Sequence, residues 1–290
     1  MVLVTLMWSI AGVVTRHLDA ARSFEVTFWR SLFNALALAV GLSLMRGTAL
    51  WRGLLGAPWP LWVSALCWAV MFTAFMVAIT LTTVANVLIT MAIAPLVTAL
   101  FARVFLRQLL PARTWAAIAF AGAGIGWMFG SEIGGPGASL VGTLVALAVP
   151  LAAAVNWTVL QHIGHGAGDL EDAAAAVPPD MLPAVLIGAL LSAAVSLPLA
   201  WPLQADAHDL GLLAMLGVVQ LAIPCLLVVH LSRVLPAPEI ALLALLEVLF
   251  GVAWVWLGAG ERPAATALGG GALVLGALVA NETLALRLRR

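Results

Sequence analysis

Ten long apolar runs make up nearly the whole sequence, and they limit its fold more than any other feature. A bilayer core about 30 Å thick is crossed by a helix of roughly 17–25 apolar residues, a length that every run except the first reaches. The connections are brief and carry the Gly, Pro and Arg of turns, as in RQLLPAR and GAGERPA. The sequence therefore predicts an all-α integral membrane protein with ten transmembrane helices and no soluble domain. The expected spans are residues 1–15, 26–45, 58–79, 82–105, 112–130, 139–162, 181–203, 209–232, 236–258 and 264–286.

The composition supports this fold class. Of the 290 residues, 64% are hydrophobic and only 9% are charged, whereas a soluble domain carries about 25% charged residues. The net charge is zero and no basic cluster is present, so we expect no nucleic-acid partner. The two cysteines, Cys67 and Cys225, lie inside apolar runs, where a thiol packs as a small hydrophobic group.

The arginines predict the orientation. They supply all 13 basic residues, and this bias, together with abundant Ala and Leu, indicates a GC-rich bacterial genome. If both termini are cytoplasmic, nine arginines lie inside and three outside, in agreement with the positive-inside rule. We therefore expect a multi-pass protein of the bacterial inner membrane with both termini in the cytoplasm. The inner set is Arg46, Arg52, Arg103, Arg107, Arg113, Arg233, Arg287, Arg289 and Arg290, and the outer set is Arg16, Arg22 and Arg262.

The chain repeats itself at a shift of about 152 residues. The run VLITMAIAPLVTALFARVFLRQLL (87–110) aligns with EIALLALLEVLFGVAWVWLGAGER (239–262), and a Gly- and Ala-rich helix follows each. We therefore divide the chain into two five-helix repeats, residues 1–136 and 137–290. An odd number of spans in each repeat turns the halves upside down relative to each other. Inverted repeats of this kind hold substrate near the bilayer midplane and alternate its access to the two sides.

Two charged residues lie inside expected spans. Glu247 stands near the middle of LLALLEVLFG, and Arg30 lies in the second span. A charge at the bilayer centre costs roughly 2.5–3.5 kcal/mol on insertion scales, so each needs a partner or a wet cavity. Glu247 is either a structural or gating group or a direct contact for substrate or a proton. Arg30 either has a structural role or binds a substrate carboxylate through its two parallel donors.

Uncharged polar and aromatic residues inside the spans are the remaining candidates for a substrate pocket. Asn86 and Thr90 share one helix face, since they are four residues apart, and Trp8 and Trp157 occupy matching repeat positions. The alternative is that the polar groups only bond neighbouring helices in lipid, at about 0.6 kcal/mol each. The candidate substrate-binding residues are Trp8, Asn86, Thr90, Asn156, Trp157, Gln161 and Gln220.

Three segments resemble the ten-helix EamA-type members of the drug/metabolite transporter superfamily. They are VTFWRSLFNALAL (26–38), TTVANVLITMAIAPLVTALFARVFLRQ (82–108) and LLALLEVLFGVAWVWLGAGERPAATALGGGALVLGALV (242–279), the last with Glu247 and the pair Gly260-Glu261. The resemblance implies outward transport of amino acids, related metabolites or toxic organic compounds. It also suggests spans one, three, six and eight as the walls of a central cavity.

The expected function is thus a secondary transporter that exports amino acids, aromatic ones included, or related small metabolites by alternating access. We expect it to be no enzyme, to need no cofactor or metal, and to be compatible with a monomer whose partners are its substrate and the bilayer. Two alternatives remain at this point: a proton-driven exporter of toxic organic cations or drugs, and an intramembrane enzyme. The sequence lacks the GxxxxGK[ST], HExxH and GxSxG motifs, which argues against ATP hydrolysis and the commonest hydrolases.

Overall fold

A computed structural model describes the chain except for residues 22, 49, 52–53, 55, 83, 131–138, 166–179, 260–264 and 289–290. All the regular secondary structure that it describes is helical, which confirms the predicted fold class. Eight helices within the described residues are long and apolar enough to cross a membrane. The other two expected spans are α8 and the short pair α1 and α2.

The helices follow the expected spans closely. Their bounds are α1 Val2–Trp8, α2 Ala11–Val14, the 3₁₀ turn η1 Thr15–His17, α3 Ser23–Arg46, α5 Trp59–Leu81, α6 Val84–Met91, α7 Ala94–Phe105, α8 Ala112–Phe129, α9 Leu140–His165, α10 Leu182–Ala200, α11 Ala207–Met215, the π-helical segment η3 Leu216–Ala222, α12 Ile223–Leu231, α13 Ala237–Ala244, α14 Leu246–Ala259 and α15 Ala265–Leu288.

Four spans expected to be continuous are irregular. The first breaks between α1 and α2, the fourth between α6 and α7, and the ninth at Leu245. The eighth contains the π-helical segment η3. Proline explains two of the irregularities, because it lacks an N–H and clashes with the carbonyl four residues earlier. In the fourth span, Pro95 stands four residues after Met91, the last residue of α6. In the eighth, Pro224 of α12 stands four residues after Gln220, which lies inside the π-helical segment. No proline accompanies the breaks at Ser9–Ile10 and Leu245.

The helices pair across the two halves as an inverted repeat requires. The third span packs on the sixth and seventh (α5 on α9 and α10), and the eighth packs on the first and second (α12 on α1, η3 on α3). The second span pairs with the seventh, the fourth with the ninth and the fifth with the tenth. Exchanging spans one to five for six to ten maps this pattern onto itself. The boundary near residue 136 lies outside the described residues, so the division into 1–136 and 137–290 stays a prediction.

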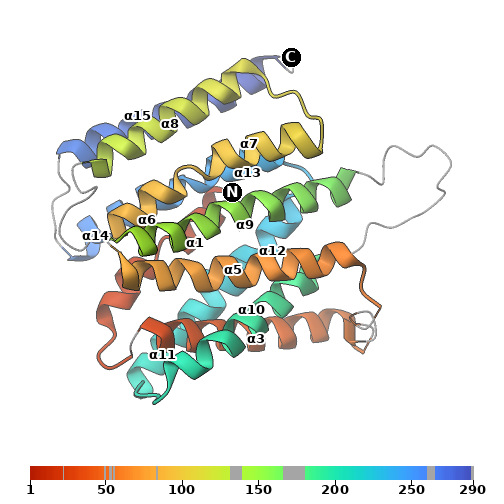
Figure 1. Cartoon of the computed structure of the whole chain (residues 1–290), viewed down its shortest axis with the longest axis vertical. Helices are drawn as coiled ribbons and strands as arrows, with labels where there is room; N and C mark the ends of the chain where they lie inside the picture. The colour runs from red at the N-terminus through yellow and green to blue at the C-terminus, as the bar shows by residue number, and fades with distance from the viewer. Residues whose placement is uncertain are drawn as a thin grey trace.

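Glycines allow some of these helices to touch backbone to backbone. Figure 1 shows α8 and α15 side by side at one edge of the molecule. A Cβ atom added at Gly124 of α8 would lie 2.7 Å from the carbonyl oxygen of Gly270 on α15, and Gly270 meets the backbone of Gly124 in return. Small residues permit such approaches between membrane helices. The fifth and tenth spans therefore depend on this glycine contact.

Two buried carboxylates tie the second span to the eighth. Glu25 Oε1 accepts hydrogen bonds from the backbone N–H groups of Gln204 (2.8 Å) and Ala205 (2.7 Å), just before α11. Asp209 of α11 accepts from the backbone N–H groups of residues 19, 20 and 21, at 2.8–2.9 Å. Each carboxylate thus accepts hydrogen bonds from the backbone N–H groups of the loop that leads into the other helix. Five charge-assisted bonds fix the starts of α3 and α11 to each other.

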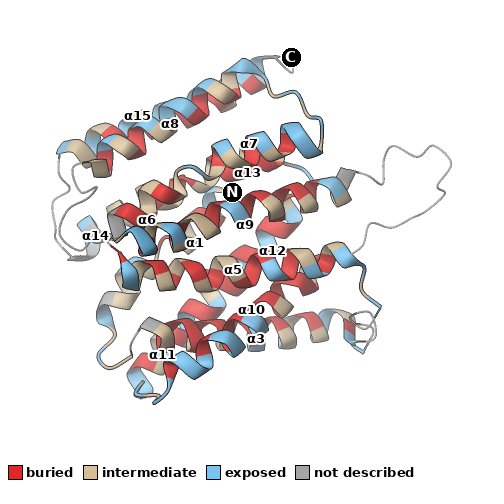
Figure 2. Ribbon diagram, viewed as in Figure 1, coloured by how far each residue is buried: buried red, intermediate tan, exposed pale blue. Residues whose placement is uncertain are grey.

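Large apolar side chains cover the outward faces of the bundle. Figure 2 shows buried residues where helices face each other and exposed ones on the outer surfaces. The exposed group includes Leu44 (83% exposed), Leu140 (77%) and Leu257 (75%), together with tryptophans such as Trp59 and Trp201. Soluble monomers rarely expose large apolar side chains in such numbers. Such a surface is what a helix bundle presents to lipid.

We predict that Gly124→Ala destabilises the protein by about 1–3 kcal/mol, because the new methyl group forces α8 away from α15. Gly126→Ala is the matched control, since a Cβ atom at Gly126 meets nothing within 4 Å. Thermal unfolding of both variants in detergent measures the difference. Equal unfolding temperatures for the two variants would contradict the contact between α8 and α15.

Candidate functional site

A cavity of about 150 Å³ lies between the two halves, near the middle of the spans that line it. Its walls come from spans one, two, three and four of the first half and from spans six, eight and nine of the second. Spans one, three, six and eight, expected around a cavity, are therefore all present. Spans five, seven and ten do not contribute.

The irregular parts of the helices converge on this cavity. Met91 and Ala94 flank the break in the fourth span, and Ala244 and Leu245 flank or form the break in the ninth. The π-helical segment contributes Gln220 and Leu221, the first span contributes Trp8 just before its break, and α9 contributes Pro150. Broken membrane helices are tolerated where they line a cavity, and in transporters they form the substrate site. The distribution of helix breaks therefore makes this cavity the candidate functional site.

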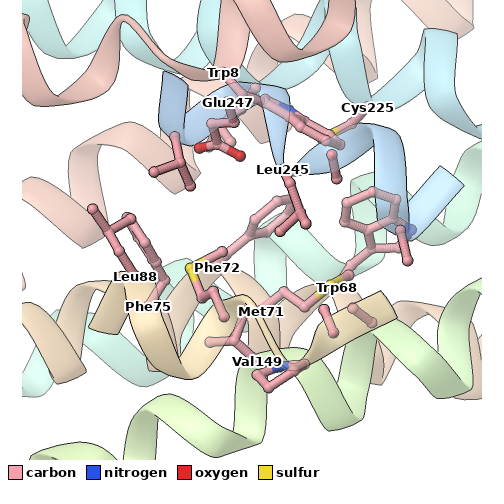
Figure 3. A pocket seen from close by; sticks show the side chains of 18 of the residues that line it. Trp8, Trp68, Met71, Phe72, Phe75, Leu88, Val149, Cys225, Leu245 and Glu247 are labelled. Carbon is pink, nitrogen blue, oxygen red and sulfur yellow. The ribbon is translucent and has the colours of Figure 1, made fainter. Parts of the chain in front are cut away.

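Aromatic side chains form much of the wall. Trp68 stacks at a tilt on Phe72, with ring centroids 5.5 Å apart, and meets Trp157 edge to face at 5.5 Å and 82°. Trp8 and Phe75 line the cavity as well (Figure 3). Such rings offer flat apolar faces to a substrate and can also attract a cation.

The cavity contains one guanidinium and one carboxylate. Arg30 on α3 is 2% exposed, and its Nη2 donates only a long bond of 3.5 Å to the carbonyl oxygen of Phe72. Glu247 on α14 is partly exposed, and Figure 3 shows its carboxylate pointing into the cavity. The two groups interact electrostatically, but no contact within 4.0 Å joins them as an ion pair in the described structure. Both charged side chains therefore line the cavity without a close partner of opposite charge among the described residues.

Gln220 links the two halves at the edge of the cavity. Its Nε2 donates to the backbone carbonyl oxygen of Trp8 at 3.2 Å, across the contact between the eighth and first spans. Trp8 in turn lies beside Cys225 (Figure 3), which also lines the cavity. Five of the candidates from the sequence thus meet in one place: Trp8, Arg30, Trp157, Gln220 and Glu247.

The other four candidates lie outside the cavity lining, where they bond neighbouring structure. Asn86 donates to Thr82 Oγ1 at 3.1 Å, and the Thr90 hydroxyl donates to the backbone oxygen of Asn86 at 2.7 Å. Asn156 accepts a hydrogen bond of 2.6 Å from Ser64 on α5. Gln161 bonds Gln108 and the backbone of Ala237. The bonds of Asn156 and Gln161 fit the alternative of hydrogen bonds between helices, whereas those of Asn86 and Thr90 run along their own span.

Sequence reasoning did not identify four residues that line the cavity: Trp68, Met71, Phe72 and Phe75. All four belong to α5, a span so uniformly apolar that its cavity face cannot be told from its other faces by pattern. The family resemblance did indicate this helix, the third span, as a cavity wall, but not which of its side chains face the cavity. The pair Gly260-Glu261, singled out by resemblance, lies outside the described residues.

One group of potential metal ligands occurs among the described residues, away from the cavity. Ligand atoms of Asp19, His208 and Asp209 lie within 4.8 Å of one another. The carboxylate of Asp209 already accepts three backbone hydrogen bonds. The position of Asp209 is explained by these bonds, which join the loop before α3 to α11.

Inverted repeats around a central cavity lined by broken helices are common among membrane transporters. Residues 1–130 match the EamA-like transporter family. This match, which covers about the first five spans, supports the resemblance found in the sequence and indicates a membrane transporter of the drug/metabolite transporter superfamily.

The likeness of the fold to a solved structure extends over nearly the whole chain. One solved crystal structure is 18% identical in sequence and has a TM-score of 0.79, covering 99% of this chain and 96% of its own. At this identity the likeness shows the fold alone. No curated protein sequence matches the chain.

Neighbouring residues on α9 test the assignment of the cavity. Asn156→Ala removes the acceptor of the Ser64 bond, so we expect a loss of about 1–3 kcal/mol in stability with KM unchanged in the folded protein. Trp157→Phe keeps an aromatic ring but changes the cavity wall, so we expect KM to rise with little loss of stability. Thermal unfolding and uptake kinetics of the two variants measure this contrast. A rise in KM for Asn156→Ala alone would place the substrate elsewhere.

Proposed function

We propose that this transporter exports amino acids, aromatic ones included, or related small metabolites across the bacterial inner membrane by alternating access. The observation that carries the proposal is the pair of opposite charges in the cavity, Arg30 and Glu247, which face one aromatic space without pairing with each other. A zwitterion carries both complementary charges. An inorganic ion or a purely apolar compound would leave at least one of them without a partner.

Each part of an aromatic amino acid finds a complementary group. A guanidinium binds a carboxylate through two parallel N–H donors, so Arg30 is assigned the α-carboxylate. Glu247 is assigned the ammonium group. The side chain then lies against Trp68, Phe72 and Trp157, where stacking is favoured but no polar group demands one particular structure. Such a division of contacts would favour amino acids as a class over one particular side chain.

The inverted repeat supplies a route for the substrate. The two halves enclose the cavity between them, and rocking of such halves exposes a central site to one side and then the other. With no nucleotide-binding motif in the sequence, the driving force is the substrate's own gradient or exchange for protons. Outward movement, the inner-membrane location and cytoplasmic termini follow from the family resemblance and the arginine distribution.

A second candidate substrate class is a toxic organic cation exchanged for a proton. Glu247 and three tryptophans around the cavity favour it, because aromatic faces attract quaternary and other organic cations. Arg30 argues against it, since a like charge in the same cavity repels a cation. If organic cations are the substrates, their export should depend on a proton gradient. Such cations should also compete with amino acids for the cavity.

The test is counterflow in proteoliposomes of the purified protein, with labelled phenylalanine and two analogues that lack either its amino or its carboxyl group. Glu247→Gln should raise KM for phenylalanine at least tenfold, the value of one hydrogen bond to a charged group, and should leave the analogue without an amino group unaffected. Arg30→Gln should do the same for the carboxyl group. Mass spectrometry of the recovered substrate should find it unaltered, whereas an intramembrane enzyme would form a product.

Glu282→Gln and Arg103→Gln are matched controls, since neither residue lines the cavity. Both should retain the kinetics of the unsubstituted protein. If Glu247→Gln and Arg30→Gln weakened all three compounds equally, the two charges would have a structural role. Saturable flux of organic cations but not of amino acids would favour the second candidate.

A further inference from the structure

The side-chain amide of Gln161 joins three helices at one end of the cavity. Its Nε2 donates to Gln108 Oε1 at 3.1 Å, just beyond the end of α7, and its Oε1 accepts from the backbone N–H of Ala237 at 2.8 Å, the first residue of α13. Gln161 itself lies on α9 and is 7% exposed. Since α7, α9 and α13 all line the cavity, this single amide ties together three of its walls.

Both partners of Gln161 are held in place by the backbone around them. The N–H of Ala237 belongs to the first turn of α13, where no carbonyl of the same helix is available, so Gln161 acts as a cap supplied by another helix. Gln108 follows Arg107, whose φ of 53° is left-handed, a conformation that is unfavourable for a residue with a side chain. The backbone N–H of Gln108 bonds Ala102 at 3.2 Å and closes this helix end.

The bridge stands directly behind the aromatic end of the cavity. Trp157 is one helical turn before Gln161 on α9, and it meets Trp68 edge to face. Ala241, which lines the cavity from α13, is likewise one turn from Ala237. The C-terminal ends of α7 and α9 lie on the same side of the bundle in Figure 1. A substrate that moves from the cavity toward these ends would meet the tryptophan pair first and then the amide bridge.

We propose that Gln161 is a gate residue whose bridge to Gln108 and Ala237 locks this end of the cavity, the end predicted to face the cytoplasm. Alternating access requires one end to close while the other opens, and a ligand moves such an equilibrium only through contacts that differ between the states. Two neutral hydrogen bonds suit this role, because they hold the helices together and can still break in each cycle. The inference concerns access and is independent of which substrate is carried.

Cys225 provides a reporter inside the cavity. Its thiol lines the cavity and is 0% exposed, so a reagent reaches it only through an opened end. The experiment measures alkylation of Cys225 by a membrane-impermeant maleimide, in a Cys67→Ala background, in vesicles of both orientations and without substrate. Gln161→Leu removes both bonds and should raise the alkylation rate from the cytoplasmic side about tenfold, since each typical bond shifts an equilibrium by a few-fold or more.

Two further variants keep the test decisive. Gln108→Leu removes one bond and keeps the one to Ala237, so it should raise the rate by about threefold; it also replaces Gln161→Leu if that variant fails to fold. Thr158→Val is the matched control on α9, because its buried hydroxyl has no hydrogen-bond partner among the described residues, and it should leave the rate unchanged. Rates equal to this control in both Gln161→Leu and Gln108→Leu would overturn the proposal. So would an increase from the outer side alone.

Because the assay uses no substrate, its result is separate from that of the counterflow experiment. A faster reaction of Cys225 in Gln161→Leu would support the gate even if amino acids proved not to be substrates. Conversely, normal amino-acid binding with unchanged alkylation would support the proposed function and reject the gate.

Discussion

The arrangement of this molecule depends on the cost of holding two opposite charges inside an apolar helix bundle. Either charge alone at a bilayer centre is unfavourable by several kcal/mol, and a close ion pair would reduce that cost. Arg30 and Glu247 interact electrostatically but stay apart on opposite halves of the chain. Both side chains line the same cavity, and under the proposed function a zwitterionic ligand replaces their interaction with its own charges. The surrounding helices are shaped to keep this space open.

That shaping takes two forms. Away from the cavity, helices touch closely through glycine, as at Gly124 and Gly270, and through the carboxylates of Glu25 and Asp209. At the cavity itself the helices are interrupted, in the fourth, eighth and ninth spans. Tight packing makes the helix pairs rigid, whereas interruptions free backbone groups and bend the spans around the space. The irregularities that a uniform hydropathy pattern hides are therefore concentrated at the site.

Sequence reasoning succeeded where burial in lipid dictates the pattern. The positions of the spans followed from apolar length, and the repeat followed from the likeness between residues 87–110 and 239–262. For single residues, polarity alone was a weaker guide. It found Arg30, Gln220 and Glu247 in the cavity but equally indicated Asn86, Thr90, Asn156 and Gln161, whose hydrogen bonds lie between or along helices. It missed Trp68 and Phe72, because an apolar side chain looks the same facing lipid or a ligand.

The most direct test of the central claim is an experimental structure of the transporter with phenylalanine bound. The account predicts density for the ligand in the cavity, with its carboxylate within hydrogen-bond distance of Arg30, its ammonium group within that distance of Glu247, and its ring among Trp68, Phe72 and Trp157. A ligand bound outside this cavity would contradict the account. So would a cavity ligand that leaves Arg30 and Glu247 paired with each other.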